Sequence, residues 1–185
     1  MTILINESQI IGKFDYKKYF SIILSILPVE YIGNLKVIHI VDKYENDIDF
    51  DSRSYGCYVI RNYYGEIFIN IGNLSNNKIP SYLYKNYPEI SALFLSEILG
   101  HEYGHHVNAF YVKYKGDSEE FAKKYAESCY YFYLKQRRLH IYISYYLASV
   151  NFLIFNRNER MMFRKSINDI KKWTNDNKHI DYPGK

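Results

Sequence analysis

One stretch organises this sequence: His101-Glu102-Tyr103-Gly104-His105, which lies inside an apolar run from about residue 90 to residue 114. A helix places residues four positions apart on the same face, about one turn from each other. His101 and His105 can therefore direct both imidazoles at one metal ion, with Glu102 beside them. Catalytic zinc sites use neutral imidazole ligands and keep one position open for water. The stretch predicts a Zn²⁺ site in which Glu102 takes the proton of that water.

The run around this stretch predicts a buried helix. Its apolar residues point in several directions rather than along one stripe. They are Leu93, Phe94, Leu95, Ile98, Leu99, Tyr103, Val107 and Phe110. Two histidines and a glutamate are costly in such a helix unless they have partners. We therefore interpret the run as an active-site helix and not as a chance match to H-E-x-x-H.

A metal site of this kind needs a third protein ligand, and three glutamates follow: Glu119, Glu120 and Glu127. Lys115-Gly116-Asp117 predicts the end of the central helix, with Asp117 capping a new one. Glu120 stands three residues after Asp117, which is the capping-box spacing, so it has a structural role. At about 100° per residue, Glu119 borders the apolar stripe of the new helix, whereas Glu120 and Glu127 lie on the far side. Glu119 is the predicted third ligand.

Glu127 remains the alternative ligand. If the two helices form a tight antiparallel hairpin about Gly116, Glu127 lies level with His105 and Glu119 lies near the turn. Glu119 then reaches the metal only if the central helix ends early or turns away.

The run from His101 to His106 resembles the active-site helix of zincin metallopeptidases, in which H-E-x-G-H is common. Glu119-Glu120-Phe121-Ala122 resembles the third-ligand motifs of gluzincins, written Asn-Glu-Gly-Phe-Ala in some aminopeptidases and Glu-x-x-Ala-Asp in other peptidases. Both motifs place the ligand three residues before the alanine. The resemblance implies Glu119 as ligand, a zincin-like fold and zinc-dependent hydrolysis of peptide bonds.

The chain departs from these families at two points. Lys123 stands where the Glu-x-x-Ala-Asp families have an aspartate that supports the ligands. The third histidine of the longer H-E-x-x-H-x-x-G-x-x-H motif is absent, since Asn108 and Tyr111 hold the later positions. His106 points about 100° away from His105, so we interpret it as a supporting or packing residue.

The residues before the central helix predict one helix and a small sheet. Helical spacing runs from Phe14 to Leu27, and Leu35–Val41 predicts a buried strand in which His39 is a core residue. Residues 55–61 and 66–71 predict a hairpin joined by Asn62-Tyr63-Tyr64-Gly65, in which Gly65 supplies a turn conformation. Loops are expected at 43–54 and 73–88. In many zinc peptidases a strand beside the metal lies antiparallel to the substrate, and either hairpin strand could serve as that edge.

The residues after the metal motif predict further helices. Residues 139–155 carry no charge, but a membrane span needs about 20 predominantly apolar residues, so we expect a buried or interface helix. A last helix is expected over residues 157–173, with Met161, Ile167 and Ile170 among its inward residues, followed by a polar, frayed tail from residue 174.

Length and composition predict one α+β domain over residues 1–185, with a helix and small sheet at 1–89, metal-site helices at 90–136 and C-terminal helices at 137–185. Cys57 and Cys129 are expected to be reduced thiols. The absence of a signal peptide pattern at the start of the sequence predicts a cytoplasmic protein. Charge is uneven: residues 135–185 hold 11 Lys and Arg against 4 Asp and Glu.

The expected function is that of a zinc metallopeptidase acting on a peptide or protein substrate, with Zn²⁺ held by His101, His105 and Glu119 and with Glu102 as the base. The alternative is a zincin-like domain that binds zinc without catalysis and whose basic C-terminal third binds nucleic acid or a membrane surface.

Overall fold

A computed structural model describes residues 4–7, 15–41, 54–73, 86–150, 157–175 and 181–183 of the chain. The protein is α+β, as predicted. Its elements in chain order are β1 (Leu4–Glu7), α1 (Tyr16–Ile26), a 3₁₀ turn (Val29–Tyr31), β2 (Leu35–Val41), β3 (Gly56–Arg61), β4 (Tyr64–Asn70), α2 (Ile71–Asn73), α4 (Pro88–Val107), a π-helical turn (Asn108–Val112), α5 (Ser118–Val150) and α6 (Arg157–Asn175).

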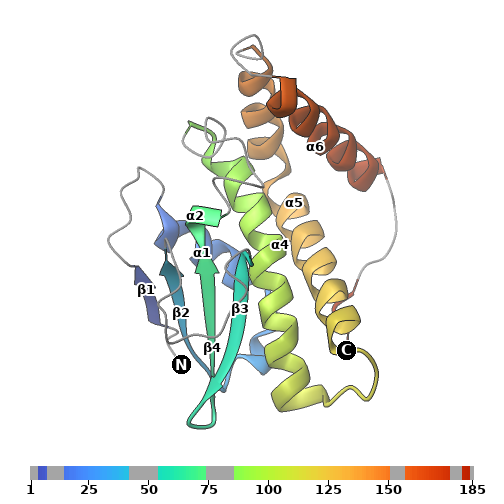
Figure 1. Cartoon of the computed structure of the whole chain (residues 1–185). Helices are drawn as coiled ribbons and strands as arrows, with labels where there is room; N and C mark the ends of the chain where they lie inside the picture. Colours follow the sequence, from blue (N-terminus) through green and yellow to red (C-terminus); the bar gives the residue numbers. More distant parts are fainter. Residues whose placement is uncertain are drawn as a thin grey trace.

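The sheet has the strand order β1-β2-β4-β3 (Figure 1). β1, β2 and β4 run parallel, and β3 runs antiparallel to β4. β2 has the predicted bounds, and its β-branched residues Val37, Ile38 and Ile40 are buried. Within the described ranges, β3 forms one end of the sheet and pairs on one side alone. This end of the sheet lies next to α4.

The predicted hairpin is present and its turn lies within the predicted residues 62–65, but the turn role predicted for Gly65 is wrong. The turn consists of Asn62 and Tyr63, whose φ angles of 48° and 66° are those of a two-residue hairpin turn with both central residues left-handed. Gly65 lies inside β4 and is buried. A Cβ at Gly65 would lie 2.5 Å from Nδ1 of His106. The missing side chain of Gly65 therefore leaves room for His106 of α4, which the local sequence does not reveal.

α4 lies between the sheet and α5, as Figure 1 shows. It packs against β3, β4, α1 and α5. α1 lies within the predicted range 14–27 and begins after Asp15, whose Oδ1 accepts a hydrogen bond from the backbone N–H of Lys18 at 3.0 Å. Pro88, which was expected to close a loop, is instead in the first turn of α4, where its missing N–H has no cost.

The central helix ends earlier than predicted. Its α-helical part stops at Val107, a π-helical turn follows, and Lys113 adopts a left-handed conformation with φ of 49°. The backbone N–H of Lys113 donates to the carbonyl of Asn108 at 2.9 Å, and that of Tyr114 donates to Oδ1 of Asn108 at 2.6 Å. Asn108 thus satisfies two N–H groups where the chain reverses direction.

Asp117 caps α5 as predicted, because its Oδ1 accepts from the backbone N–H of Glu119 at 2.8 Å. Glu120 lies in the expected first turn but forms an ion pair with Lys124 at 2.7 Å. Its position is therefore explained by a pair one helical turn apart, in addition to the favourable placement of a carboxylate at a helix N-terminus.

Two glycines allow α4 and α5 to approach closely. A Cβ at Gly100 would lie 2.5 Å from Cβ of Cys129, and one at Gly104 would lie 2.8 Å from Cα of Ala122. Each glycine directly precedes one of the two motif histidines. The small residue Ala126 on α5 is also buried in this region. The spacing of small residues thus brings the start of α5 against the metal-motif part of α4.

α5 runs from Ser118 to Val150, but it consists of two helical parts that meet at a kink at Arg137 (φ −109°, ψ 15°). The expected division at 136/137 coincides with this kink. Of the uncharged run 139–155, the part up to Val150 is described and residues 151–156 lie outside the described ranges. Ile141, Tyr145 and Ala148 are buried, but other apolar residues of this part are exposed. Among the described helices, none has the length and hydropathy of a membrane span.

The C-terminal residues differ from prediction in two respects. Met161 of α6 is 61% exposed, although it was expected to point inward, whereas Ile170 is buried as predicted. Tyr182 lies in the expected frayed tail yet is only 6% exposed. Its hydroxyl donates to the carbonyl of Ile26 at 3.0 Å, and its ring packs 5.1 Å from that of Phe132. Tyr182 thus belongs to the core, although Asp181 before it is exposed.

Candidate metal centre

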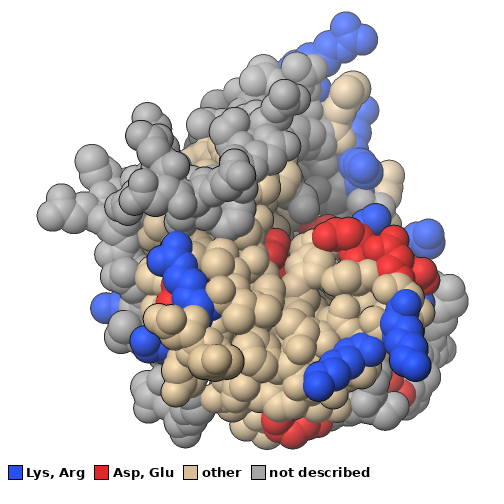
Figure 2. All heavy atoms as spheres, turned by 60° about the horizontal axis from the view of Figure 1, so that its bottom comes forward, with Lys and Arg blue, Asp and Glu red and all other residues tan. Residues whose placement is uncertain are grey.

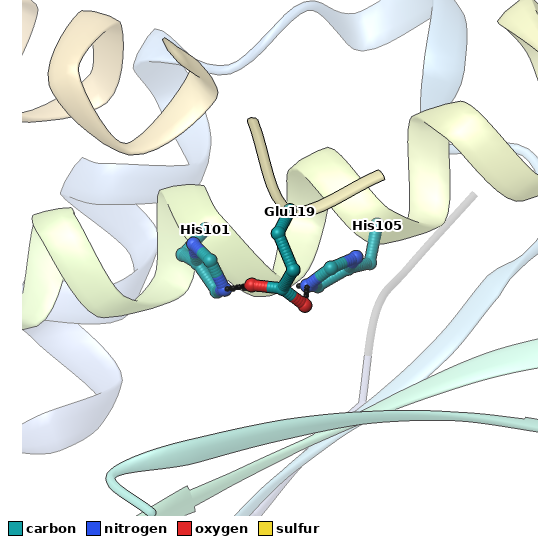
Figure 3. A group of neighbouring side chains, drawn as sticks. All are labelled: His101, His105 and Glu119. Carbon is teal, nitrogen blue, oxygen red and sulfur yellow. Dashed lines mark hydrogen bonds and ion pairs between the residues drawn. The ribbon is translucent and has the colours of Figure 1, made fainter. Parts of the chain in front are cut away.

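Three predicted ligands come together at the end of α4 and the start of α5 (Figure 3). Nε2 of His101 and Nε2 of His105 are 3.2 Å apart. Oε2 of Glu119 lies 3.4 Å from His101 Nε2, and Oε1 lies 3.2 Å from His105 Nε2. The three side chains therefore point at one common position. Among the described residues, these three side chains form a group that could hold a metal ion.

The spacing of these atoms is close enough for one zinc ion. Zinc binds imidazole nitrogen and carboxylate oxygen at about 2.0–2.2 Å, so two ligand atoms of a tetrahedron lie about 3.3–3.6 Å apart. The two imidazole nitrogens are 3.2 Å apart, each lies 3.2–3.4 Å from a different oxygen of Glu119, and one ligand atom taken from each residue gives a set within 4.8 Å. Two neutral imidazoles and one carboxylate also form a donor set that zinc accepts readily. The residues present fit the ion that the sequence implied.

Glu119 reaches this position because α4 ends early. The π-helical turn and the left-handed Lys113 redirect the chain after Val107, so α5 starts close to the histidines. The sequence predicted that Glu119 could be a ligand only if the central helix ended early or turned away, but it did not show whether the helix does so. The alternative ligand, Glu127, is exposed, lies two turns further along α5 and is not part of the group.

Both motif histidines are held in the neutral form that metals require. Burial lowers the pKa of His101, with a further contribution from His105, and burial also lowers the pKa of His105. Nδ1 of His105 lies 3.2 Å from Oγ of Ser118, which also accepts a hydrogen bond from Nδ2 of Asn108 at 3.3 Å. With Nε2 as the ligand atom, Nδ1 carries the proton and donates to Ser118. This contact fixes the ring and the tautomer.

Glu102 lies beneath the histidines and is only 6% exposed. Burial raises the pKa of its carboxyl to about 8, with a smaller contribution from Glu119. Its carboxylate lies against β3, since a Cβ at Gly56 would be 2.7 Å from Oε1 of Glu102. A carboxyl that takes up a proton near neutral pH is suited to general acid and base work.

His106 ties the active-site helix to the sheet. Its Nδ1 lies 3.1 Å from the hydroxyl of Tyr58 on β3, and its Nε2 lies 3.0 Å from the carbonyl of Tyr31. Burial lowers its pKa to about 4. The neutral ring has one N–H and one acceptor nitrogen, so a proton on Nε2 serves Tyr31 while Nδ1 accepts from Tyr58. His106 is the supporting residue that the sequence predicted.

A cleft of about 500 Å³ opens beside the three ligands. It is lined by Ser54, Gly56, Cys57, Tyr58, His101, Glu102, His105, Asn108, Ala109, Ser118 and Glu119. A second hollow of similar size shares His101 and Glu102 and extends towards Lys123 and Glu127. Figure 2 brings this end of the molecule forward and shows charged side chains in small groups around a largely uncharged surface.

Sequence reasoning missed three residues around the site: Gly56, Ser118 and Asn108. Ser118 directly precedes Glu119, and Asn108 follows His105 by three positions on the same helical face, so their spacing was a usable signal. Gly56 had no local signal because its contact with Glu102 joins distant parts of the chain. His39 stacks on Phe68 with ring centres 4.3 Å apart and is no member of the metal-ligating group.

Both cysteines are free thiols, as expected.

Comparisons of the chain with protein-family models, with curated proteins and with solved structures found no match. The function is therefore argued from the geometry of the three ligands, Glu102 and the adjoining strand.

Proposed function

We propose that the protein is a zinc-dependent metallopeptidase of the gluzincin type with a zincin-like fold. The observation that carries the proposal is the convergence of His101, His105 and Glu119 at separations of 3.2–3.4 Å, with Glu102 buried beside them. When bound, zinc supplies a Lewis acid that lowers the pKa of water and polarises a carbonyl.

The chain supplies the base and the proton carrier. Glu102 adjoins both His101 and the cleft, where its carboxylate takes a proton from water and passes it to the leaving amine. Its burial beside the cleft keeps the carboxyl out of bulk water, which favours holding that proton between the two steps. The hydrogen bond from His105 to Ser118 keeps the second imidazole in its ligating orientation.

The position of strand β3 beside the cleft is the reason for proposing a peptide as the substrate. Gly56, Cys57 and Tyr58 of this strand line the same cleft as Glu102 and the histidines. Within the described ranges the other side of β3 pairs with no strand, so its backbone can hydrogen-bond an extended peptide.

Metal content tests the zinc site. Purified wild type, Glu119→Gln and Glu127→Gln are dialysed against limiting zinc and analysed for metal per chain. We expect about one zinc in the wild type and in Glu127→Gln, and clear loss in Glu119→Gln, because removing the anionic ligand leaves only two imidazoles. Glu127→Gln is the matched control, since it makes the same chemical change on the same helix. A folded wild type that binds no zinc would overturn the site.

Cleavage tests the chemistry. Wild type and Glu102→Gln, both loaded with zinc, are incubated with a peptide mixture that is followed by mass spectrometry. Loss of the general base is expected to slow cleavage about 10²–10⁴-fold while zinc content stays unchanged. A Glu102→Gln protein that binds zinc and cleaves as fast as the wild type would contradict the proposed role.

A further inference from the structure

The second half of α5 presents an exposed apolar face. Five of its side chains are half or more exposed: Leu139 (69%), Ile143 (50%), Tyr146 (69%), Leu147 (50%) and Val150 (67%). Helical spacing puts all five on one side, opposite the buried residues Ile141, Tyr145 and Ala148. We refer to these five residues as the α5 stripe. A continuous exposed apolar surface of this kind marks a binding surface more often than ordinary scattered exposure does.

The surroundings of the α5 stripe are basic. Lys135 and Arg138 are exposed at its start, and the guanidinium of Arg138 lies 5.7 Å from the ring centre of Tyr142. α6 packs against α5 (Figure 1). It carries further exposed cations: Arg157, Arg164, Lys165, Lys171 and Lys172. Residues 135–185 hold 11 basic against 4 acidic residues. The apolar surface therefore lies in a cationic part of the molecule.

We propose that the α5 stripe binds the surface of an anionic lipid membrane. An interfacial helix places apolar side chains at the boundary of headgroups and acyl chains while neighbouring cations attract anionic headgroups. The stripe supplies the apolar side chains, and Tyr142 and Tyr146 have the amphipathic rings that favour this boundary. Lys135, Arg138 and the cations of α6 supply the attraction.

Two other occupants fit less well. A second copy of the chain would bring two cationic ends together, and the stripe covers fewer than the three to four heptads that a stable coiled coil needs. Nucleic acid requires cations along the contact surface to neutralise phosphates. Residues 139–150 contain no Lys or Arg, so no side chain of the stripe can form an ion pair with a phosphate.

The stripe lies well away from the candidate metal centre. At 1.5 Å per residue, Leu139 is about 30 Å along the helix from Glu119. A membrane bound at the stripe therefore leaves the cleft accessible. The inference does not depend on the proposed function, since vesicle binding requires neither zinc nor catalysis.

Vesicle flotation tests the proposal with the full chain. The protein is mixed with vesicles of phosphatidylcholine alone or of phosphatidylcholine with about one third phosphatidylserine, at low and at high salt. The first variant is Leu139→Gln/Tyr146→Gln, which changes the two most exposed residues of the stripe. The control is Val29→Gln/Tyr63→Asn, which changes two exposed apolar residues elsewhere (76% and 89%). Circular dichroism verifies that all three proteins are folded.

We expect the wild type and the control to float with anionic vesicles, less so at high salt, and the stripe variant to bind at least tenfold more weakly. Absence of binding to anionic vesicles by the wild type would overturn the proposal. Equal binding by the stripe variant would also overturn it. Sedimentation that shows a wild-type dimer and a monomeric stripe variant, without vesicle binding, would assign the surface to a second copy. If the protein instead binds nucleic acid, with an affinity that falls with salt and is the same in the wild type and the stripe variant, the membrane proposal is contradicted and the cations contact phosphates.

Discussion

The close approach of α4 and α5 makes Gly104→Ala an informative substitution. The added Cβ would lie 2.8 Å from both Cα of Ala122 and Cβ of Tyr125. Carbon atoms in contact are usually about 3.5–4.0 Å apart, so the helices must separate locally by roughly 1 Å. Overpacking of this kind costs about 1–3 kcal/mol. Because Ala122 contributes its backbone and cannot swing aside, we expect a cost near the upper end.

Two effects determine the net result for Gly104→Ala. Alanine is the better helix former by about 1 kcal/mol, which leaves a loss of about 2 kcal/mol in the free energy of unfolding. The same displacement moves Glu119 relative to the histidines. Ligand distances in a metal site tolerate only about 0.2 Å, so zinc affinity is expected to fall tenfold or more.

Urea unfolding without metal and competition with a chromophoric zinc chelator measure these two effects separately. Gly33→Ala is the control, because the nearest atom to its added Cβ is the tip of a flexible side chain, the Tyr111 hydroxyl at 2.9 Å. Gly104→Ala with wild-type stability would refute the close-packing argument. Lower stability with unchanged zinc affinity would show that the spacing of the helices does not control how Glu119 binds.

Three further predictions concern groups around the site and the core. Ser118→Ala removes the partner of His105 Nδ1, so zinc affinity measured by chelator competition is expected to fall about tenfold, with unfolding little changed. Burial lowers the pKa of His106 to about 4 in the folded chain, against 6.5 in the unfolded chain. Its contribution to the free energy of unfolding is therefore complete above pH 6.5 and is lost as the pH falls towards 4. Urea unfolding in the presence of a chelator should show that the wild type loses about 3 kcal/mol more free energy of unfolding than His106→Gln over this range. Glu89→Ala removes the buried carboxylate that pairs with Arg137 and accepts from the hydroxyls of Tyr19 and Tyr133, which should lower the free energy of urea unfolding by about 3 kcal/mol; a change below about 1 kcal/mol would contradict a stabilising role for this network.

The buried network around Glu89 explains why α5 bends where it does. Glu89 accepts from Nε of Arg137 at 3.2 Å and forms a short contact with Nη2, and it also accepts from the hydroxyls of Tyr19 and Tyr133. Arg137 is the residue with non-helical backbone angles. One carboxylate thus joins α1, α4 and α5 at the point where the second half of α5, with its exposed stripe, begins.

Local sequence was sufficient wherever a short pattern carries its own physical cause. β-branched residues predicted β2 with its observed bounds, and Asp117 predicted the start of α5. The four-residue spacing of His101 and His105 follows from helical geometry alone, so their convergence was predictable. The preference for Glu119 over Glu127 as the inward-facing carboxylate came from the same geometry, and the structure places Glu119 with the histidines.

The remaining features depend on contacts between residues far apart in the chain. Glycine at 65 looked like a turn residue, but it is required by His106 from α4. The tail looked polar and frayed, but Tyr182 fills space beside Phe132 and Tyr125 that other segments create. The described part of the uncharged run, residues 139–150, has one buried and one exposed side, which no local pattern reveals. Sequence therefore determined which residues have the chemistry of a metal site, whereas the early end of α4 and the close packing of α5, both set by tertiary contacts, decided that Glu119 lies within reach of both histidines.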